Sequence, residues 1–393
     1  MNKPKSHIAV TGTKGKSTTL RIIQHAFLIN EISVWGSYGL DGRYHNGTVN
    51  EKRSDCVDYL KILEKSEILL SEATSFILTL NNVYQEESID VAIFTSFDNT
   101  EHMELHHTGK KYLQDKMNIF NFLKKNGVAI INKDIKEFDQ ITSKIKQKII
   151  SYGLDKSSDY VVGDIEQSIF GTTFSITNKN TKHLIKTKLI SEANMLNMTA
   201  GIIAVVETQQ LTIDEVIASM SSFPGVKGRC NFFRIPDCNN EVVIDYAHTA
   251  GSLEEILKTL KIVSDKKLVC IFGCGGNKSI EKRSPMGLIA EKYADKIIIT
   301  NDNPRKESPH KIANDILKDI KNRDKFEIIL DRSLAIKSTL HNNHNCIILI
   351  AGKGAEHSIS FSEFEFPYND HNTVLTYAIS NQYAMMKAAQ YVD

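Results

Sequence analysis

The chain has 393 residues, of which 41% are hydrophobic and 24% are charged, and its formal net charge is +1. This length suits two domains, and this composition excludes an intrinsically disordered chain. Because there is no basic excess, the charge indicates neither a nucleic-acid partner nor a membrane-surface partner. No apolar run reaches the roughly 18 residues of a membrane span, and the first residues lack the apolar core of a signal peptide. We therefore expect a soluble cytoplasmic protein.

The first half alternates short apolar runs with amphipathic stretches, as expected when helices cover a parallel sheet. The predicted strands occupy residues 7–12, 33–40, 67–73, 90–97 and 127–134. The predicted helices occupy residues 16–30, 109–125 and 192–209. Residues 159–178 have strand-turn-strand character and predict an antiparallel extension. The predicted fold class is therefore α/β with a mostly parallel sheet.

The segment SSFPGVKGR (221–229) combines Ser, Pro and Gly and predicts a linker. After it the alternation restarts, with predicted strands at 241–249, 267–276, 295–303, 325–331 and 345–354. We therefore expect two domains, residues 1–222 and 223–393. Polar clusters follow the strands of both halves, and ligands of open α/β sheets bind outside the carboxyl ends of strands. These clusters predict a composite site where the two domains face each other.

The most specific motif is TGTKGKST (11–18), which lies between a predicted strand and a predicted helix. It lacks the first glycine of the pattern G-x-x-x-x-G-K-[ST], because a valine stands there. Gly12 and Gly15 would still let the backbone approach a phosphate, and the helix N-terminus would add N–H donors. Lys16 would neutralise phosphate oxygens, and the Ser17 hydroxyl would reach Mg²⁺. We predict a nucleotide site here, against the alternative of an ordinary glycine turn.

Three further positions of the first half suggest metal chemistry. Glu72 ends a predicted strand, where its carboxylate would suit Mg²⁺, although such a glutamate is more often a solvated edge residue. His102 lies in the polar segment TSFDNTEHMELHH (95–107) and is a candidate metal ligand. A zinc cluster there is the rival interpretation, but no matched cysteines complete it. Lys116 follows on a predicted helix, where spacing alone indicates only a solvated lysine.

In the second half, Asp245 and His248 end a predicted strand. Two arginines, Arg283 and Arg305, follow in the motifs GGNKSIEKRSP and NDNPR. Because arginine binds carboxylates and phosphates through paired hydrogen bonds, these motifs predict a second, anionic ligand. Surface salt bridges are the alternative. The six cysteines form no zinc pattern, and we expect them to be reduced thiols.

Seven motifs together carry a family resemblance: TGTKGKST, SEATS, EHMELHH, DYAHT, KRSPMG, DNPR and AGKGAE. In order and spacing the sequence resembles the Mur ligases, the ATP-dependent amide-bond ligases of peptidoglycan assembly. Among them it is most similar to the MurE-type UDP-N-acetylmuramoyl-tripeptide synthetases, whose short loop also lacks the first glycine. The resemblance implies a P-loop, ATP-binding central domain (1–222) and a Rossmann-like, amino-acid-binding C-terminal domain (223–393). It also implies amide formation through an acyl phosphate.

The resemblance implies a role for each matching residue. ATP would be bound by Gly12, Thr13, Lys14, Gly15, Lys16, Ser17, Thr18, Asn194, Asn197, Arg229 and Asp245. Mg²⁺ would be bound by Ser17, Glu72, His102 and a carbamylated Lys116, and the catalytic set would be Lys16, His102 and Lys116. The incoming amino acid would be bound by Arg283, Asn303, Arg305, Gly352 and Glu356. DNPR resembles the version that grips the distal carboxylate of meso-diaminopimelate.

The sequence departs from the family pattern on the acceptor side. The family's UDP-binding domain would precede His7, and its Thr-Thr-Pro acceptor loop is replaced by residues 53–55, Arg-Ser-Asp. Ala355 stands where the family has histidine. We therefore expect a smaller, non-UDP carboxylate acceptor, or a partner protein that supplies acceptor binding. The alternatives are the cell-wall addition of meso-diaminopimelate, a non-catalytic ATP-binding regulator and a P-loop kinase.

Overall fold

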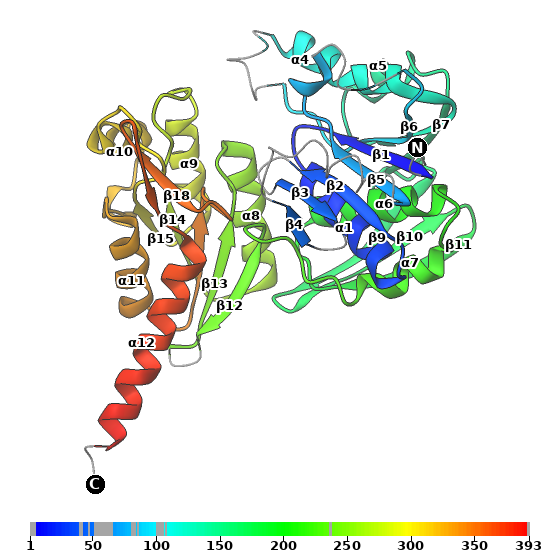
Figure 1. Cartoon of the computed structure of the whole chain (residues 1–393). Helices are drawn as coiled ribbons and strands as arrows, with labels where there is room; N and C mark the ends of the chain where they lie inside the picture. The colour runs from blue at the N-terminus through cyan, green and yellow to red at the C-terminus, as the bar shows by residue number, and fades with distance from the viewer. Residues whose placement is uncertain are drawn as a thin grey trace. The chain divides into compact units, whose positions relative to one another are not determined.

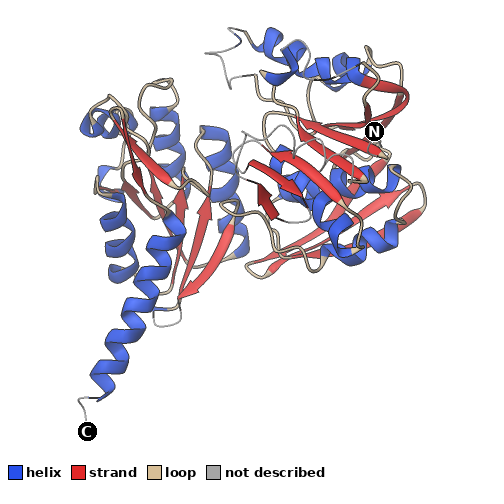
Figure 2. Ribbon diagram, in the orientation of Figure 1, coloured by secondary structure: helices blue, strands red, loops and turns tan. Residues whose placement is uncertain are grey.

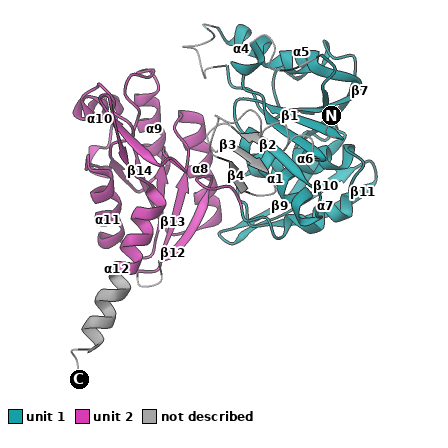
Figure 3. Ribbon diagram, in the orientation of Figure 1, with its two compact units in different colours: residues 1–224 teal, residues 225–393 magenta. Residues whose placement is uncertain are grey.

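Helices and strands alternate along the chain (Figure 1, Figure 2). The computed structural model describes all residues except 1–4, 39–41, 46–47, 51–65, 80–83, 85, 100–105, 107, 236–237 and 391–393. For the remaining residues between 37 and 50, and for 381–390, it describes the backbone alone. Two compact units result, Met1–Pro224 and Gly225–Asp393 (Figure 3).

Unit 1 is built on one large sheet, with the strand order β11-β10-β9-β8-β7-β6-β1-β5-β2-β3-β4 along the described chain. The parallel strands are β1 (Ser6–Thr11), β2 (Val34–Tyr38), β5 (Ile68–Glu72), β6 (Ile89–Phe94), β7 (Leu123–Asn132) and β8 (Lys148–Gly153). β9 (Tyr160–Ser168) joins in parallel and then continues into antiparallel β10 (Gly171–Asn178) and β11 (Thr181–Thr187). The opposite edge holds antiparallel β3 (Gly42–His45) and β4 (Thr48–Asn50). The predicted parallel sheet with an antiparallel extension is confirmed.

Helices cover both faces of this sheet. They are α1 (Lys16–Ile29), α4 (Gly109–Met117), α5 (Phe138–Thr142), α6 (Glu192–Glu207) and α7 (Ile213–Met220), with short 3₁₀ turns η1 (Ile77–Thr79) and η2 (Asn118–Phe122). In β6, Ala92 and Phe94 pack in the core that also contains Leu113 of α4 and Ile141 of α5. Because successive strand side chains point to opposite faces, Val91 and Ile93 face the layer of α6.

The predicted single helix over residues 109–125 is shorter in the structure. α4 ends at Met117, η2 follows, and Leu123 already begins β7. Ile119, Phe120 and Leu123 are buried in the same core cluster. Their spacing mimics a continuing helix, but the chain must turn there because Leu123 pairs with Ile89 of β6.

Unit 2 contains a second sheet, with the strand order β12-β13-β17-β14-β15-β16. Its strands are β12 (Asn231–Ile235), β13 (Asn240–Asp245), β14 (Lys267–Phe272), β15 (Lys296–Ile299), β16 (Phe326–Ile328) and β17 (Cys346–Ala351). All pairings are parallel except β12 with β13, so the Rossmann-like expectation for this half is confirmed. Around it lie α8 (Ala250–Val263), α9 (Arg283–Tyr293), α10 (Pro309–Ile316), η4 (Arg323–Lys325), α11 (Arg332–Asn342) and α12 (Asp370–Gln390).

A two-stranded hairpin, β18 (Ser358–Phe361) and β19 (Phe364–Pro367), precedes α12. β17 is central in its sheet, and all six of its residues are buried. Such a continuous apolar run is typical of a parallel strand covered on both faces. Among the residues described, no helix combines the length and the hydropathy that crossing a membrane requires.

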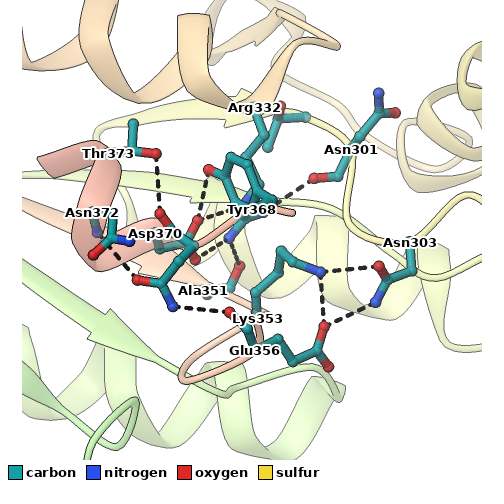
Figure 4. Close-up of polar contacts among 12 residues, drawn as sticks. Asn301, Asn303, Arg332, Ala351, Lys353, Glu356, Tyr368, Asp370, Asn372 and Thr373 are labelled. Atoms are coloured by element: carbon teal, nitrogen blue, oxygen red, sulfur yellow. Dashed lines mark hydrogen bonds and ion pairs between the residues drawn. The ribbon is translucent and has the colours of Figure 1, made fainter. Parts of the chain in front are cut away.

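A buried ion pair fixes the start of α12 (Figure 4). Arg332 donates through Nε and Nη2 to the two carboxylate oxygens of Asp370, at 2.8 and 2.9 Å. The same guanidinium donates to the carbonyl oxygens of Asn301 (3.2 Å) and Ala351 (2.9 Å). The Tyr368 hydroxyl also donates to Asp370, at 2.9 Å. Arg332 therefore ties α12 to the loops that follow β15 and β17.

Replacing Arg332 by Met should destabilise unit 2 by about 3–5 kcal/mol, because Asp370 would keep a buried charge without its partner. We expect a lower denaturation midpoint and faster hydrogen exchange over residues 370–380. The double variant Arg332→Met/Asp370→Leu removes both charges and should recover much of this loss. A double variant as unstable as the single one would contradict the ion-pair explanation.

Candidate active site

The loop between β1 and α1 is held in place by the residues that follow β6. Thr13 N donates to Ser96 O, and Lys14 N donates to Ser96 Oγ, both at 2.8 Å. Thr95 Oγ1 donates to Lys14 O at 2.6 Å. The backbone N–H of Asp98 donates to Thr13 Oγ1 at 3.0 Å. Two adjacent parallel strands thus form the loop together, at their carboxyl ends, as expected for a ligand site of an open α/β sheet.

Two positions in this loop accept only glycine. Gly12 has φ 144°, and a Cβ there would lie 2.1 Å from Thr95 Oγ1. Gly15 has φ 86°, and a Cβ there would lie 2.2 Å from Asn197 Oδ1 of α6. Positive φ and close approach both require a residue without a side chain. Gly15 is also the N-cap residue of α1, so its conformation sets the direction in which the first N–H groups of the helix point.

Lys16, Ser17 and Glu72 are brought together at this loop. Lys16 Nζ donates to Gly12 O (3.0 Å) and Thr13 O (3.1 Å) and lies 3.9 Å from Glu72 Oε1. Ser17 Oγ donates to the other Glu72 oxygen at 2.9 Å. Lys16 therefore lies over the loop backbone, with its charge partly balanced by Glu72. A hydroxyl and a carboxylate side by side are the hard oxygen ligands that Mg²⁺ prefers, so these residues fit that ion.

Lys116 of α4 reaches the same loop from the other side. Its Nζ donates to Gly12 O at 2.7 Å, and the residue is only 1% exposed. Burial lowers the pKa of Lys116 well below its usual value, repulsion from Lys16 lowers it further, and the Glu72 charge opposes both. A lowered pKa favours the neutral amine, which is a nucleophile that can add to CO₂ with loss of a proton and form a carbamate.

One predicted metal ligand, His102, cannot be placed in this geometry. His102, and the polar residues around it up to position 105, lie outside the described residues. Among the residues that are described, no group of three or more His, Cys, Asp and Glu side chains could hold a metal ion.

Of the two predicted asparagines on α6, Asn197 reaches the loop. It is 8% exposed, and Thr19 Oγ1 donates to its Oδ1 at 3.5 Å. Asn194 lies in the first turn of α6, where its Nδ2 donates to Ile190 O at 2.7 Å. Thr18 is buried in the first turn of α1. The contacts of Asn194 and Asn197 with the nucleotide stay predictions.

The two predicted nucleotide contacts of unit 2 lie beside Tyr246. The Arg229 guanidinium stacks over the Tyr246 ring, 4.4 Å from its centre. Asp245 accepts from Cys230 N at 2.8 Å and from Ala247 N at 2.7 Å, so it shapes the turn that carries Tyr246. Burial, with the Glu356 charge adding, raises the pKa of Tyr246 to about 12, so its hydroxyl stays neutral.

Asn303, Lys353 and Glu356 form a compact cluster after β15 and β17 (Figure 4). Lys353 Nζ donates to Asn303 Oδ1 at 3.0 Å and to Glu356 Oε2 at 2.7 Å, and Asn303 Nδ2 donates to the same Glu356 oxygen at 3.0 Å. The Lys353 side chain is 0% exposed, whereas that of Glu356 is 26% exposed. Gly352 has φ 112°, and a Cβ there would lie 2.6 Å from Asp302 Oδ2.

Lys353 is not among the site residues predicted from the sequence. Its only signal is its place in AGKGAE, two residues beyond the end of buried β17. A lysine in a polar glycine loop suggests solvent, and its burial becomes evident only when Asn303 and Glu356 are seen around it.

The two predicted arginines have different surroundings. Arg283 is 0% exposed, and its Nη1 donates to Glu307 at 2.9 Å and to Asp315 at 2.8 Å. Arg305 is half-buried, and its Nη1 donates to Gly276 O (2.8 Å) and Asn303 O (3.5 Å), while its backbone N–H donates to Ser360 O (3.0 Å). Arg283 could reach an amino acid only after breaking its ion pairs, and that contact stays a prediction. Arg305 is the better placed arginine for an anionic ligand.

Comparison with known proteins gives the family. Residues 10–205 match the Mur ligase middle domain, and residues 228–354 match the Mur ligase, glutamate ligase domain. The chain is 34% identical over 388 residues to the UDP-N-acetylmuramoyl-L-alanyl-D-glutamate–2,6-diaminopimelate ligase of Rickettsia montanensis. That alignment covers 95% of this chain and 79% of the relative. The chain belongs to the Mur ligase family.

A second relative and a solved structure agree. The ligase of the same name from Syntrophomonas wolfei is 32% identical over 366 residues, which cover 89% of this chain and 73% of the relative. A solved structure of such a diaminopimelate ligase is similar with a TM-score of 0.68 and 28% identity, over 97% of this chain and 80% of that one. As a Mur ligase, the chain is an ATP-dependent amide ligase, and the family uses ATP with Mg²⁺.

Gly15→Ala should weaken binding of ADP and ATP about tenfold or more, because strain of roughly 1–3 kcal/mol would displace the loop. The matched control is Gly163→Ala, where a Cβ would meet only Ser175 Oγ, at 3.6 Å. Calorimetric titration with ADP measures both. If Gly15→Ala binds ADP like the parent protein, the loop is not the nucleotide site.

Proposed function

We propose that this chain joins an amino acid of the 2,6-diaminopimelate class to the carboxylate of a peptidoglycan precursor, at the cost of ATP. The observation that carries this proposal is that the accessible Arg305 of unit 2 donates to Gly276 O (2.8 Å) and Asn303 O (3.5 Å), while Asn303 Nδ2 donates to Glu356 (3.0 Å). This group offers a cation for a distal carboxylate and a carboxylate for an ammonium group. Relatives that are named for 2,6-diaminopimelate ligation support the same amino acid.

The chemistry proposed for unit 1 is phosphoryl transfer to the acceptor carboxylate. A carboxylate oxygen attacks the γ-phosphorus and the bond to the β–γ bridging oxygen breaks. The products are ADP and the acyl phosphate of the acceptor. Lys16 would neutralise the phosphate oxygens, and the N–H groups at the start of α1 would bind them. Ser17 and Glu72 would hold Mg²⁺, which supplies further charge neutralisation when bound.

Amide formation follows. The amino nitrogen of the incoming amino acid attacks the acyl carbon, and the tetrahedral intermediate expels inorganic phosphate. Glu356 and Asn303 would orient the amino acid, and Arg305 would select one with a distal carboxylate. Protein groups mainly position the reactants and neutralise charge in this mechanism.

The acceptor proposed here is the one that the names of the relatives support, and it replaces the smaller acceptor expected from the sequence. The expected smaller, non-UDP acceptor relied on where the chain begins and on residues 53–55, which lie outside the described residues. The relatives are named for UDP-N-acetylmuramoyl-L-alanyl-D-glutamate, which favours the cell-wall alternative. An assay with a panel of acceptors distinguishes this precursor from a smaller carboxylate and from an acceptor that a partner protein binds.

The deciding experiment is a phosphate-release assay with UDP-N-acetylmuramoyl-L-alanyl-D-glutamate and a panel of amino acids, with mass spectrometry of the product. We expect meso-diaminopimelate to react much faster than lysine, which lacks the distal carboxylate. Arg305→Met should lower kcat/KM for meso-diaminopimelate about 10- to 100-fold and leave lysine little changed, because a charge-assisted contact contributes about 1.5–3 kcal/mol. Arg234→Met, at an exposed arginine of the same unit, is the control.

Three outcomes would redirect the proposal. Turnover with small carboxylates but not with the UDP precursor would restore the smaller acceptor. An acyl phosphate that hydroxylamine traps as a hydroxamate, with no amide formed from any amino acid, would indicate a kinase. ADP binding without turnover, together with a Lys16→Ala variant that only loses partner binding, would indicate a regulator.

We also propose that Lys116 acts as a carbamate, formed by attack of its neutral amine on CO₂ with loss of a proton. The lowered pKa and the burial of Nζ support this chemistry, and the remaining N–H could still donate to Gly12 O. Lys116→Ala should reduce kcat at least 100-fold, and acetate or formate should restore part of it by replacing the lost carboxylate. Lys116→Arg, which cannot be carbamylated, should not respond. Equal responses of both variants would contradict the carbamate.

A further inference from the structure

A buried chain of hydrogen bonds in unit 1 lies next to the proposed Mg²⁺ ligands without including any of them. It joins Ser75, in the loop after β5, to His106 and then to Asp115 and Lys111 on α4. The Ser75 hydroxyl and His106 Nε2 are 2.9 Å apart, and His106 Nδ1 and Asp115 Oδ2 are 2.8 Å apart. Lys111 Nζ donates to the other Asp115 oxygen at 2.6 Å. None of these four residues is among the site residues predicted from the sequence.

The direction of these bonds follows from the groups involved. A carboxylate only accepts, so His106 Nδ1 carries a hydrogen and donates to Asp115. In the neutral ring Nε2 then accepts from the Ser75 hydroxyl. Ser75, His106 and Asp115 are 7%, 6% and 1% exposed, so water does not compete for the bonds. Such a fully satisfied buried network gives its elements one defined arrangement.

The elements joined by His106 are those that carry the proposed Mg²⁺ ligands. Ser75 stands three residues after Glu72, and Asp115 immediately precedes Lys116. Ser17, in the first turn of α1, donates to Glu72, and Lys116 donates to Gly12 O of the preceding loop. The loop and the start of α1 therefore hold the end of β5 and α4 through separate hydrogen bonds.

His106 supplies a hydrogen-bonded link between the segment after β5 and α4, beside the apolar contacts of Ala73 with the core that contains Leu113. The Tyr112 ring supports this link from α4. The centre of the Tyr112 ring lies 4.8 Å from that of the His106 ring and 4.5 Å from Lys116 Nζ. Among the described residues, the loop, the end of β5 and α4 thus form a closed triangle of contacts.

We propose that His106 is a positioning residue, whose two ring nitrogens set the separation between Glu72 and Lys116 and so the geometry in which the chain binds Mg²⁺ with its nucleotide. The inference rests on the proposed function only in assuming that this pair of side chains serves Mg²⁺ and ATP. It is independent of the amino acid and of the acceptor.

Two variants each keep one of the two bonds. In His106→Asn the amide nitrogen can replace Nδ1 and donate to Asp115, but the link to Ser75 is lost. In His106→Gln the longer amide can replace Nε2 and meet Ser75, but the link to Asp115 is lost. We expect both variants to need about tenfold more Mg²⁺ for half-maximal phosphate release, with kcat at saturating Mg²⁺ within threefold of the parent.

A binding measurement tests the same idea without catalysis. Titration of Mn²⁺ into the protein with bound ADP, followed by electron paramagnetic resonance, should show about tenfold weaker Mn²⁺ binding in both variants. It requires neither acceptor nor amino acid, so it stays decisive even if the proposed substrates are wrong. His25→Asn is the matched control, because His25 also bridges two segments of unit 1, through Ser219 O and Ser222 Oγ at 3.0 Å.

A second pair of variants covers the case in which the His106 variants do not fold. Ser75→Ala should weaken Mn²⁺ binding in the same way, and Ser75→Thr, which keeps the hydroxyl, should restore it. Unchanged Mn²⁺ affinity in folded His106 or Ser75 variants would overturn the proposal. A fall in kcat that excess Mg²⁺ does not repair, with parental Mn²⁺ affinity, would overturn it as well.

Discussion

Two lysine ammonium groups share one acceptor, the carbonyl oxygen of Gly12, and much of unit 1 depends on this arrangement. Lys16 reaches it from the first turn of α1 at 3.0 Å, and Lys116 reaches it from α4 at 2.7 Å. Two ammonium groups at one acceptor repel each other, and this repulsion disfavours the charged form of each. Burial is the main cause of the lowered pKa of Lys116, repulsion from Lys16 lowers it further, and the Glu72 charge opposes both. A lowered pKa makes the neutral, nucleophilic form of an amine easier to reach.

Parallel sheets explain why the polar groups gather where they do. In each unit the central strands are parallel, so their carboxyl ends lie along one edge, and the loops there combine residues far apart in sequence. In unit 1 that edge collects lysines and one carboxylate, which suits phosphates and Mg²⁺. In unit 2 it collects Arg305, Asn303 and Glu356, which suits a molecule that carries both charges. The ion pair of Arg332 with Asp370 holds the closing segment of unit 2 against this second group.

Neutralisation of buried charge is the recurring requirement. Arg283 is balanced by Glu307 and Asp315, and Lys353 by Glu356. The sequence does not show that either cation is buried. The partners of Arg283 lie 24 and 32 positions away, and Asn303, which also contacts Lys353, lies 50 positions away. Arginine in a strand-end loop predicts an anionic ligand equally well when the anion is another part of the protein. This is why Arg283 and Arg305 looked equivalent in the sequence and differ in the structure.

The sequence by itself determined the α/β fold, the family and the loop TGTKGKST, because these depend on local periodicity and on residues within one short segment. It also placed Lys16, Ser17 and Glu72 at strand ends, which is enough to bring them together in a parallel sheet. Only the tertiary structure decided that Lys116 is buried and has a lowered pKa, which arginine remains accessible, and that His106 links the end of β5 to α4. Those properties arise from burial and from partners distant along the chain, and no local pattern records them.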